Sequence, residues 1–385
     1  MFLIGTKKRM KIEMVDLKGQ YLNIKEEIDQ ATISVIRDAQ YINGPEVCKF
    51  TNELSQYLDG AYVIPCANGT DALQLAMMAL DLKPGDEVIV PSFTYVATAE
   101  VIGLLKLTPV MVDVDSSSFN ITVESIKIAI TPRTKAIVPV HLFGQCADME
   151  PILALAREYG LYVIEDTAQA IGAAYTFKDG VIKKAGTMGH IGCTSFFPSK
   201  NLGCYGDGGA IFTMDSELAN KIQMISNHGQ EKKYVHKYIG INSRLDTIQA
   251  AILRIKLRHL DNYSSARRSA AEKYDKLLQG IPNLIIPTRS NNSNHVFHQY
   301  TLKVPGGKRD ALKKYLENAG IPAMIYYPIS LNEQEAYQSI GLVVGDLSVT
   351  RNLCSSVLSI PMHTELSDVQ IEYITSSIIK FFRNE

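Results

Sequence analysis

The stretch SFFPSKNLGCYGDGGA, residues 195–210, gives the first indication of the fold and of its chemistry. The apolar run Cys193–Phe197 has the pattern of a strand and leads through a Pro-Ser pair to Lys200. A glycine cluster follows, and a second strand pattern covers residues 210–214. Burial of a lone lysine at a strand end lowers its pKa and makes its amine a usable nucleophile. The alternative is an ordinary basic residue in a glycine-rich loop.

A second motif, LYVIEDTAQA at residues 161–170, favours the chemical interpretation of Lys200. It lies about 35 residues upstream and puts Asp166 directly after a buried strand. A buried carboxylate is costly unless it has a partner. The N-terminus of the next helix is one possible partner, and a bound cofactor is the other.

Strand and helix patterns alternate along the first half of the chain, which predicts a parallel, right-handed α/β sheet. Ligands of such sheets bind at the carboxyl ends of the strands, and Tyr95 and Asp166 both follow strand ends. No GxGxxG motif follows a predicted strand, which argues against a dinucleotide-binding Rossmann protein. The expected strands are 61–65, 87–90, 109–114, 135–140, 161–165, 193–197 and 210–214, and the expected helices are 19–38, 46–58, 92–105, 122–130, 149–159 and 217–225.

The C-terminal third predicts a smaller α+β domain. Residues 247–278 are expected to form one long helix or two. The expected division into domains is residues 1–262 and 263–385. Packing of the N-terminal helix on the small domain is an open alternative. The other expected elements are strands at 296–304, 324–328 and 358–362 and helices at 308–319 and 368–382.

The segment CANGTDAL, residues 66–73, joins a short strand to a helix. A strand, a turn of small residues and a helix present free backbone N–H groups to an anion. A plain helix cap by Asn68 or Thr70, without a ligand, explains the spacing equally simply.

Composition excludes several classes of function. The 39 basic and 40 acidic residues among 385 give a net charge of −1, which argues against a general nucleic-acid or membrane-surface binder. No apolar run reaches the ~20 residues that span a bilayer, and the start MFLIGTKKRM does not resemble a signal peptide, although Met10 could be an alternative start. Six cysteines without a CxxC pair or a zinc spacing predict reduced thiols, a cytoplasmic location and no metal site.

These motifs together resemble the DegT/DnrJ/EryC1/StrS sugar aminotransferases, a branch of the fold-type I pyridoxal 5′-phosphate (PLP) enzymes. The resemblance extends from DLKGQY at Asp16 to PMHTELS at Pro361. It implies an aspartate-aminotransferase-like fold with a large, mostly parallel sheet and a smaller C-terminal domain. It also implies that Lys200 binds PLP covalently, and that the presence of lysine there, where some relatives have histidine, favours transamination over dehydration.

The resemblance assigns roles to further residues. Asp166 would pair with the pyridinium nitrogen, Gln169 would contact the ring oxygen O3′, and Tyr95 would stack on the ring. The phosphate would be bound by Gly69, Thr70, Asp71 and Ser195, and by Asn242 of a second subunit in a homodimer. The substrate-side positions would be His228, Arg244, Tyr326 and Tyr327.

Within the family, phrases such as FGQCADM and NSRLDTIQAAIL are most similar to enzymes acting on UDP-2-acetamido-2-deoxy-3-oxo-glucuronic acid. Arg244 would grip the uronate carboxylate, because a guanidinium fork matches a carboxylate. Without the resemblance, an ion pair with Asp246 explains Arg244 equally well. L-glutamate is the expected amino donor, pyridoxamine phosphate the expected form of the cofactor during turnover, and surface polysaccharide such as O-antigen the expected destination. The alternatives are an aminotransferase for a dTDP- or UDP-linked 3- or 4-keto-6-deoxysugar, and a non-catalytic PLP-binding regulator.

Overall fold

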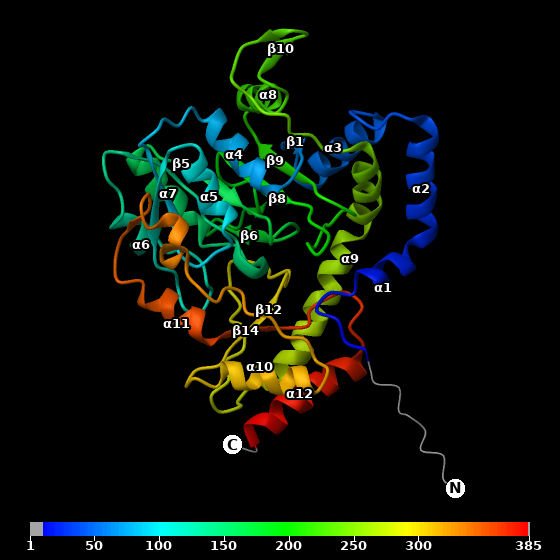
Figure 1. The fold of residues 1–385 in the computed structure, drawn as a ribbon, viewed down its shortest axis with the longest axis vertical. Coiled ribbons are helices and arrows are strands. Elements are labelled where there is room, and N and C mark those ends of the chain that lie inside the picture. The colour runs from blue at the N-terminus through cyan, green and yellow to red at the C-terminus, as the bar shows by residue number, and fades with distance from the viewer. Residues whose placement is uncertain (1–10, 384–385) are drawn as a thin grey trace.

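The computed structural model describes residues 11–383 and contains an eight-stranded sheet in the order β1-β9-β8-β5-β4-β2-β3-β13. All neighbours from β8 to β13 are parallel, whereas β9 is antiparallel to both β1 and β8. The predicted, mostly parallel α/β sheet is therefore confirmed (Figure 1). The strands are β1 (Tyr62–Cys66), β2 (Glu87–Pro91), β3 (Thr108–Val112), β4 (Thr134–Ile137), β5 (Tyr162–Asp166), β8 (Ile191–Ser195), β9 (Gly209–Thr213) and β13 (Leu342–Val343).

Helices cover both faces of this sheet. Along β2, Val88 and Val90 enter one hydrophobic core while Ile89 enters another, because successive side chains of a strand point to opposite faces. One core includes α4 (Gly69–Ala79), α5 (Ala97–Leu104) and α8 (Ser216–Ile225); the other includes α6 (Val123–Lys127) and α7 (Met149–Tyr159). A third core, at the β9 end, joins α3 (Pro45–Tyr57) to the first half of α9 (Thr247–Leu278).

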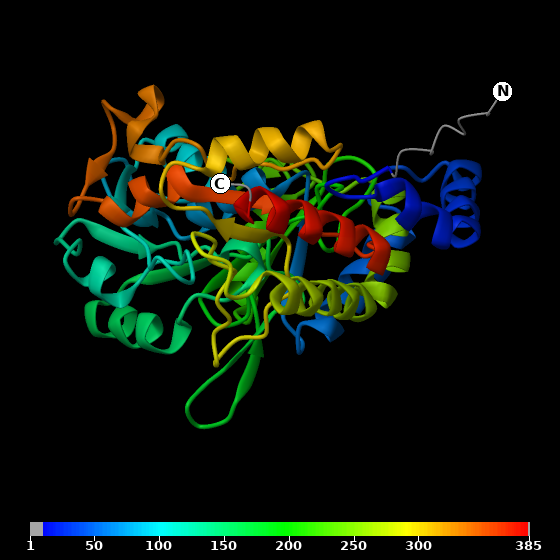
Figure 2. The same ribbon diagram turned by 90° about the horizontal axis from the view of Figure 1, so that it is seen from below.

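A separate core lies at the C-terminal end of α9. There β12 (Tyr300–Lys303) pairs with β14 (Val357–Ile360), and α10 (Arg309–Asn318) and α12 (Asp368–Arg383) pack against them. Figure 2 shows α12 between α10 and the second half of α9. Ile12 joins this core, so the N-terminal segment does contact it. The expected division at residue 262 falls inside the continuous helix α9, and the division into two domains stays a prediction.

Several expected elements differ from the structure. The helix expected at 19–38 breaks at Ile24 into α1 (Leu17–Asn23) and α2 (Lys25–Asp38), and the helix expected at 92–105 begins only at Ala97. The strand expected at 296–304 starts at Tyr300, because Phe297 has a φ of +45°, which a strand does not accommodate. The strand expected at 324–328 is wrong: only Met324 pairs, with Ser359. The elements that periodicity missed are β13, α11 (Ser348–Ser356) and the short 3-10 turns Leu142–Gly144, Leu331–Glu333 and Glu335–Tyr337.

Two hairpins leave the body of the molecule. One is formed by β6 (Ala174–Thr176) and β7 (Ile182–Lys184), which pair antiparallel. The long polar segment after α8 forms β10 (Gln230–Lys232) and β11 (Val235–His236), which we call the arm and which projects at the top of Figure 1. The alternative start at Met10 lies outside the described residues. Within residues 11–383, no helix combines the length and apolar character needed to cross a bilayer.

Candidate active site

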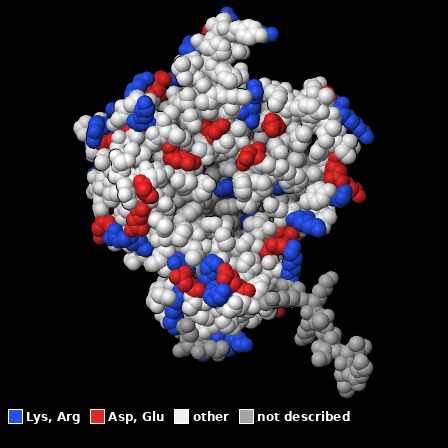
Figure 3. Space-filling view, viewed as in Figure 1, with Lys and Arg blue, Asp and Glu red and all other residues white. Residues whose placement is uncertain are grey.

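A cavity of about 820 Å³ opens where β5 and β8 end, beside the N-terminus of α4. Figure 3 shows the surface hollowed near the middle of the face that it presents. Topology explains the place, because the carboxyl ends of parallel strands meet at one edge of the sheet. Of the residues predicted from the sequence, those that line the cavity are Gly69, Thr70, Asp71, Tyr95, Asp166, Gln169, Ser195, Lys200, Tyr326 and Tyr327.

Asp166 is the last residue of β5 and is 6% exposed. Thr98 Oγ1 donates a hydrogen bond to its Oδ2 at 2.9 Å, and the backbone N–H of Ala168 donates to Oδ1 at 3.1 Å. Both bonds fix the orientation of the carboxylate. One side of Asp166 is thus satisfied by the protein, and the carboxylate is presented to the cavity.

The neighbouring acid, Glu165, is fully buried on the opposite face of the same strand. Its carboxylate accepts hydrogen bonds from the backbone N–H groups of residues 186, 188 and 189 and contacts His141 Nε2 at 2.9 Å. His141 Nδ1 accepts from the N–H of Ala147, so Nε2 must carry the proton that is donated to Glu165. Glu165 is therefore satisfied within the protein, which leaves Asp166 as the acid of the cavity.

Lys200 lies in a tight turn after β8. Its N–H bonds the carbonyl of Phe197 at 2.8 Å, and a side chain at Gly203 would come within 2.4 Å of the Pro198 carbonyl, so the turn requires glycine there. Burial lowers the pKa of Lys200 to about 8, and the negative charge of Asp166 opposes part of that shift. At pH 7 about a tenth of this amine is therefore neutral and nucleophilic, about 300-fold more than with the ordinary pKa of 10.5.

The N-terminus of α4 forms an anion cradle. Asn68 caps it by accepting from the N–H of Asp71 at 2.8 Å, and within the described chain no hydrogen-bond partner occupies the N–H groups of Gly69 and Thr70. A side chain at Gly69 would approach Ser195 Cβ to 2.7 Å, so only glycine lets the two segments meet. Ser195 Oγ accepts from the N–H of Phe197, which leaves its own proton free to donate. Free amides, a helix dipole and hydroxyls suit a phosphate group.

Aromatic and amide side chains form another wall. Gln169 Oε1 accepts from the N–H of Phe143 at 2.8 Å, and its Nε2 donates to the hydroxyl of Tyr327 at 3.1 Å. Tyr95 is 57% exposed, and its ring centroid lies 6.3 Å from that of Tyr327. Tyr326 is half-buried beside Tyr327. Gln169 is thus a bonded part of the wall, and Tyr95 presents an open aromatic face.

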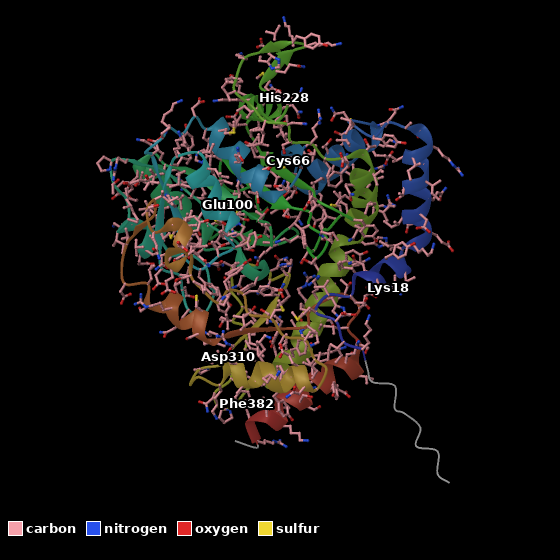
Figure 4. All side chains as sticks on the ribbon, viewed as in Figure 1. Lys18, Cys66, Glu100, His228, Asp310 and Phe382 are labelled. Carbon is pink, nitrogen blue, oxygen red and sulfur yellow. The ribbon has the colours of Figure 1, made fainter. Side chains whose placement is uncertain are left out.

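Three predicted residues, His228, Asn242 and Arg244, do not line the cavity. Figure 4 shows His228 at the base of the arm, and Asn242 is exposed and pairs with Asn227. Between Asn242 and Arg244, Ser243 donates to Asp71 Oδ2 at 2.6 Å and accepts from the N–H of Ala67 at 3.0 Å. Asp71 therefore holds the segment that carries Asn242 and Arg244, and its carboxylate is engaged within the protein.

Sequence patterns missed other residues of the site. Thr98, which is buried behind Asp166, lies three residues after Tyr95 in the segment SFTYVAT, residues 92–98, and that spacing is the signal that could have indicated it. Asp207, His298 and Gln299 line the cavity itself. The last two precede β12, more than 90 residues after Lys200, so no local pattern could have placed them there. Within residues 11–383, no three His, Cys, Asp or Glu side chains gather as a metal site requires.

The sequence profile of the DegT/DnrJ/EryC1/StrS aminotransferase family matches residues 22–379. The chain belongs to this family. A UDP-2-acetamido-2-deoxy-3-oxo-D-glucuronate aminotransferase from Pseudomonas aeruginosa is 46% identical over 95% of this chain and 99% of its own length. A pleiotropic regulatory protein from Geobacillus stearothermophilus is 44% identical over 97% and 100%, and a UDP-N-acetyl-3-dehydro-alpha-D-glucosamine 3-aminotransferase from Acidithiobacillus ferrooxidans is 45% identical over 95% and 97%.

Solved structures of aminotransferases of this family share the fold. A DegT/DnrJ/EryC1/StrS aminotransferase from Brucella abortus superposes with a TM-score of 0.92 at 41% identity, covering 97% of this chain and all of its own. NtdA from Bacillus subtilis, solved with pyridoxamine phosphate bound, superposes at 0.87 with 31% identity, covering 98% of this chain and 87% of its own. This family member is a PLP-dependent aminotransferase, and its cavity fits that cofactor. It offers an amine at Lys200, a carboxylate at Asp166 and an anion cradle at Gly69, Thr70 and Ser195.

Proposed function

We propose that the enzyme transfers an amino group from L-glutamate to C3 of UDP-2-acetamido-2-deoxy-3-oxo-glucuronic acid. The products are 2-oxoglutarate and the 3-amino sugar nucleotide, a building block for surface polysaccharide of the O-antigen type. The observation that carries the aminotransferase chemistry is the placement of Lys200 and Asp166 in one cavity beside the anion cradle. The Pseudomonas relative, by its name, supports the substrate. The cytoplasmic location expected from the cysteines stays a prediction.

Each residue of the cavity then has a task. Bound PLP supplies a conjugated ring that takes up the electron pair left when the donor's Cα loses a proton. Asp166, oriented by Thr98, would hold the ring nitrogen protonated, while the amides of Gly69 and Thr70 and the Ser195 hydroxyl would bind the phosphate. Lys200 Nζ would hold the cofactor covalently and, when free, act as the base that carries the proton. Tyr95 would stack on the ring, as the aromatic wall allows.

Charge argues for a second copy of the chain. Within residues 11–383, the side chains lining the cavity include the acids Asp71, Asp166 and Asp207, and the cations among them are limited to Lys200. Glutamate and a sugar nucleotide are anions, so the substrate-binding cations must come from elsewhere. The arm carries Lys232 and Lys233, and Arg244 follows it.

The exposed apolar side chains of the arm also support a second copy of the chain. On the arm, Tyr234 is 82% exposed, and Ile239 just after it is 90% exposed, a large apolar area to leave in water. We infer a homodimer in which the arm, with His228, Asn242 and Arg244, completes the cavity of the partner. Tyr326 and Tyr327 would contact the substrate from within the same chain.

Two of the relatives differ at C6 of the sugar they are named for: one substrate is a uronate, the other a glucosamine with a neutral hydroxymethyl group. A guanidinium–carboxylate pair contributes about 1.5–3 kcal/mol, or about 10- to 150-fold. Arg244→Ala should therefore lower kcat/KM by that factor for the 3-oxo-glucuronate and by less than about 3-fold for the 3-oxo-glucosamine nucleotide. Equal losses on both substrates would remove the proposed role of Arg244.

Mixed dimers test the shared site. Pure Lys200→Ala is expected to be inactive on the uronate, and pure Arg244→Ala is expected to keep at most about a tenth of the parent's activity. After the two are unfolded and refolded together, half of the dimers pair one of each, and one of the two sites in such a dimer is intact. Activity should return to about a quarter of the parent's. No recovery, with dimers formed, would show that each site is built within one chain.

The product test separates this proposal from its rivals. Mass spectrometry after incubation with glutamate and each candidate nucleotide should show the amino sugar from the UDP-3-oxo-uronate. A product from a keto-6-deoxysugar alone would favour that alternative. The relative named as a regulatory protein favours a second candidate, a PLP-binding regulator. That candidate predicts bound PLP that no amino donor alters.

A further inference from the structure

The segment 295–299, just before β12, is held in a strained backbone conformation at the edge of the cavity. Phe297 is fully buried and has a φ of +45°, an outlier for a bulky side chain. The N–H of Val296 donates to the carbonyl of Gly144 at 2.9 Å, and a side chain at Gly144 would come within 3.0 Å of the backbone nitrogens of Phe297 and His298. Phe143, which precedes Gly144, also has a positive φ. Strain of this kind persists where the surroundings enforce it, and it gathers at functional sites.

Two side chains, those of Arg267 and Asn201, hold the segment 295–299 in this conformation. Arg267 of α9 is 3% exposed, and its NH1 group donates to the carbonyls of Phe297 and Met362 at 3.0 Å and of His298 at 3.4 Å. Asn201, the residue after Lys200, donates to the carbonyl of Val296 at 3.0 Å. The turn that carries Lys200 and the segment that carries His298 are therefore bonded to each other. This pairing places the His298 ring in the cavity that Lys200 lines.

The ring nitrogens of His298 face different surroundings. Nδ1 is buried and has no hydrogen-bond partner, as is true of Arg267 Nε. Nε2 is the nitrogen that stays accessible, and the residue lines the cavity. Burial, the charge of Lys200 and the charge of Arg267 all hold the pKa of His298 well below its usual range, so the ring is neutral. A proton on Nδ1 would be a buried donor without an acceptor, so we assign the ring proton to Nε2.

Lys200 Nζ, in turn, has no hydrogen-bond partner within residues 11–383. We propose that His298 is a positioning residue for Lys200: once Nζ is free and neutral, the lysine turns within the cavity so that the Nε2–H of His298 donates a hydrogen bond to it. That bond would aim the lone pair of the amine and hold the lysine in the cavity whenever it is not bound to the cofactor. A neutral donor does this without adding charge beside the amine, as a histidine that charged would do. The inference rests on the proposed role of Lys200 as the proton-carrying base.

Rates test the proposal with three variants. His298→Leu keeps an apolar body of similar size but removes the donor, and it should lower the rate constant of the glutamate half-reaction about 10-fold with little change in KM for glutamate. His298→Gln places an amide N–H near Nε2 and should stay within about 3-fold of the parent. His363→Asn is the matched control, a histidine that is 3% exposed, does not line the cavity, and has a pKa lowered to about 4 by burial and Arg267. It should keep the parent's rate.

A second measurement needs neither cofactor nor turnover. In apoenzyme labelled with 15N-histidine, the His298 signal, identified by its loss in His298→Gln, should show the neutral Nε2–H form and should shift with a midpoint near pH 8, where Lys200 titrates. The charged or titratable groups around it are Lys200, Arg267 and those that line the cavity: Asp71, Tyr95, Asp166, Cys193, Asp207, Tyr326 and Tyr327. The buried Lys256 of α9 also has a pKa lowered to about 8, so Lys200→Ala is essential: it should abolish the shift.

Three results would each overturn the proposal. They are no shift of the His298 signal near pH 8 in the parent, a shift that persists in Lys200→Ala, and an unchanged rate in His298→Leu. Should His298→Leu melt before it can be assayed, His298→Gln and the titration still decide. Failure of the parent to react with glutamate would instead remove the proposed donor reaction and leave the apoenzyme titration to be read by itself.

Discussion

Replacing Asp166 with asparagine should slow the glutamate half-reaction about a thousandfold while leaving the fold and PLP binding in place. Asp166 is 6% exposed, and its two protein hydrogen bonds come from Thr98 and Ala168. At a typical effective dielectric constant of about 20, a carboxylate stabilises a positive charge at 4 Å by about 4 kcal/mol. Each 1.36 kcal/mol added to the activation barrier slows the reaction tenfold, so losing about 4 kcal/mol of stabilisation slows it by about 10³.

The isostere should not disturb the local structure. The asparagine oxygen still accepts from one neighbour, and the Thr98 hydroxyl can reverse its role and accept from the asparagine amide. The control is Asp310→Asn, the same exchange at an exposed acid of α10, which is labelled in the lower part of Figure 4, away from the cavity. It should react within about 2-fold of the parent.

Stopped-flow absorbance at saturating glutamate measures this step, because the PLP and pyridoxamine phosphate forms absorb at different wavelengths. Equilibrium titration with PLP measures binding separately. If Asp166→Asn loads with PLP and reacts within about 10-fold of the parent, the carboxylate is not the group that holds the ring nitrogen protonated.

Three further changes follow from the same geometry. Apoenzyme should take up PLP at a rate that rises with pH to a midpoint near 8, since Lys200 reacts as the neutral amine; a midpoint near the ordinary 10.5 would show that burial does not act on it. Thr98→Val removes one hydrogen bond to Asp166 and should slow the glutamate half-reaction about 10-fold without affecting PLP affinity; a parent-like rate would show that Ala168 suffices. Gly69→Ala puts a carbon 2.7 Å from Ser195 Cβ and should weaken PLP binding at least about 10-fold, measured by titration; unchanged affinity would mean that the cradle widens freely.

Local patterns predicted the large sheet and residues at strand ends that line the cavity, for physical reasons. Motifs at strand ends, such as Asp166 after β5 and Ser195 at the end of β8, are placed by the sheet itself, so that periodicity is enough to bring them together. The helix α9 was expected at residues 247–278 and has those bounds, because its apolar pattern is uninterrupted.

The misses occurred where tertiary contacts decide the conformation. Phe297 shortens the strand expected from residue 296 because Arg267, distant in sequence, holds its carbonyl. The same bonds bring His298 into the cavity, which no spacing in the chain could indicate. The backbone N–H groups that bond Glu165 come from a loop more than 20 residues later, so no local pattern could indicate its partners.

The most direct test of the central claim is the absorption spectrum of the purified protein before and after L-glutamate, with Lys200→Ala beside it. The account predicts a visible band of bound PLP that glutamate converts to the near-ultraviolet band of pyridoxamine phosphate, and no such conversion on this time scale in Lys200→Ala. Absence of any PLP band after incubation with the cofactor, or a PLP band in the parent that glutamate leaves unchanged, would contradict it.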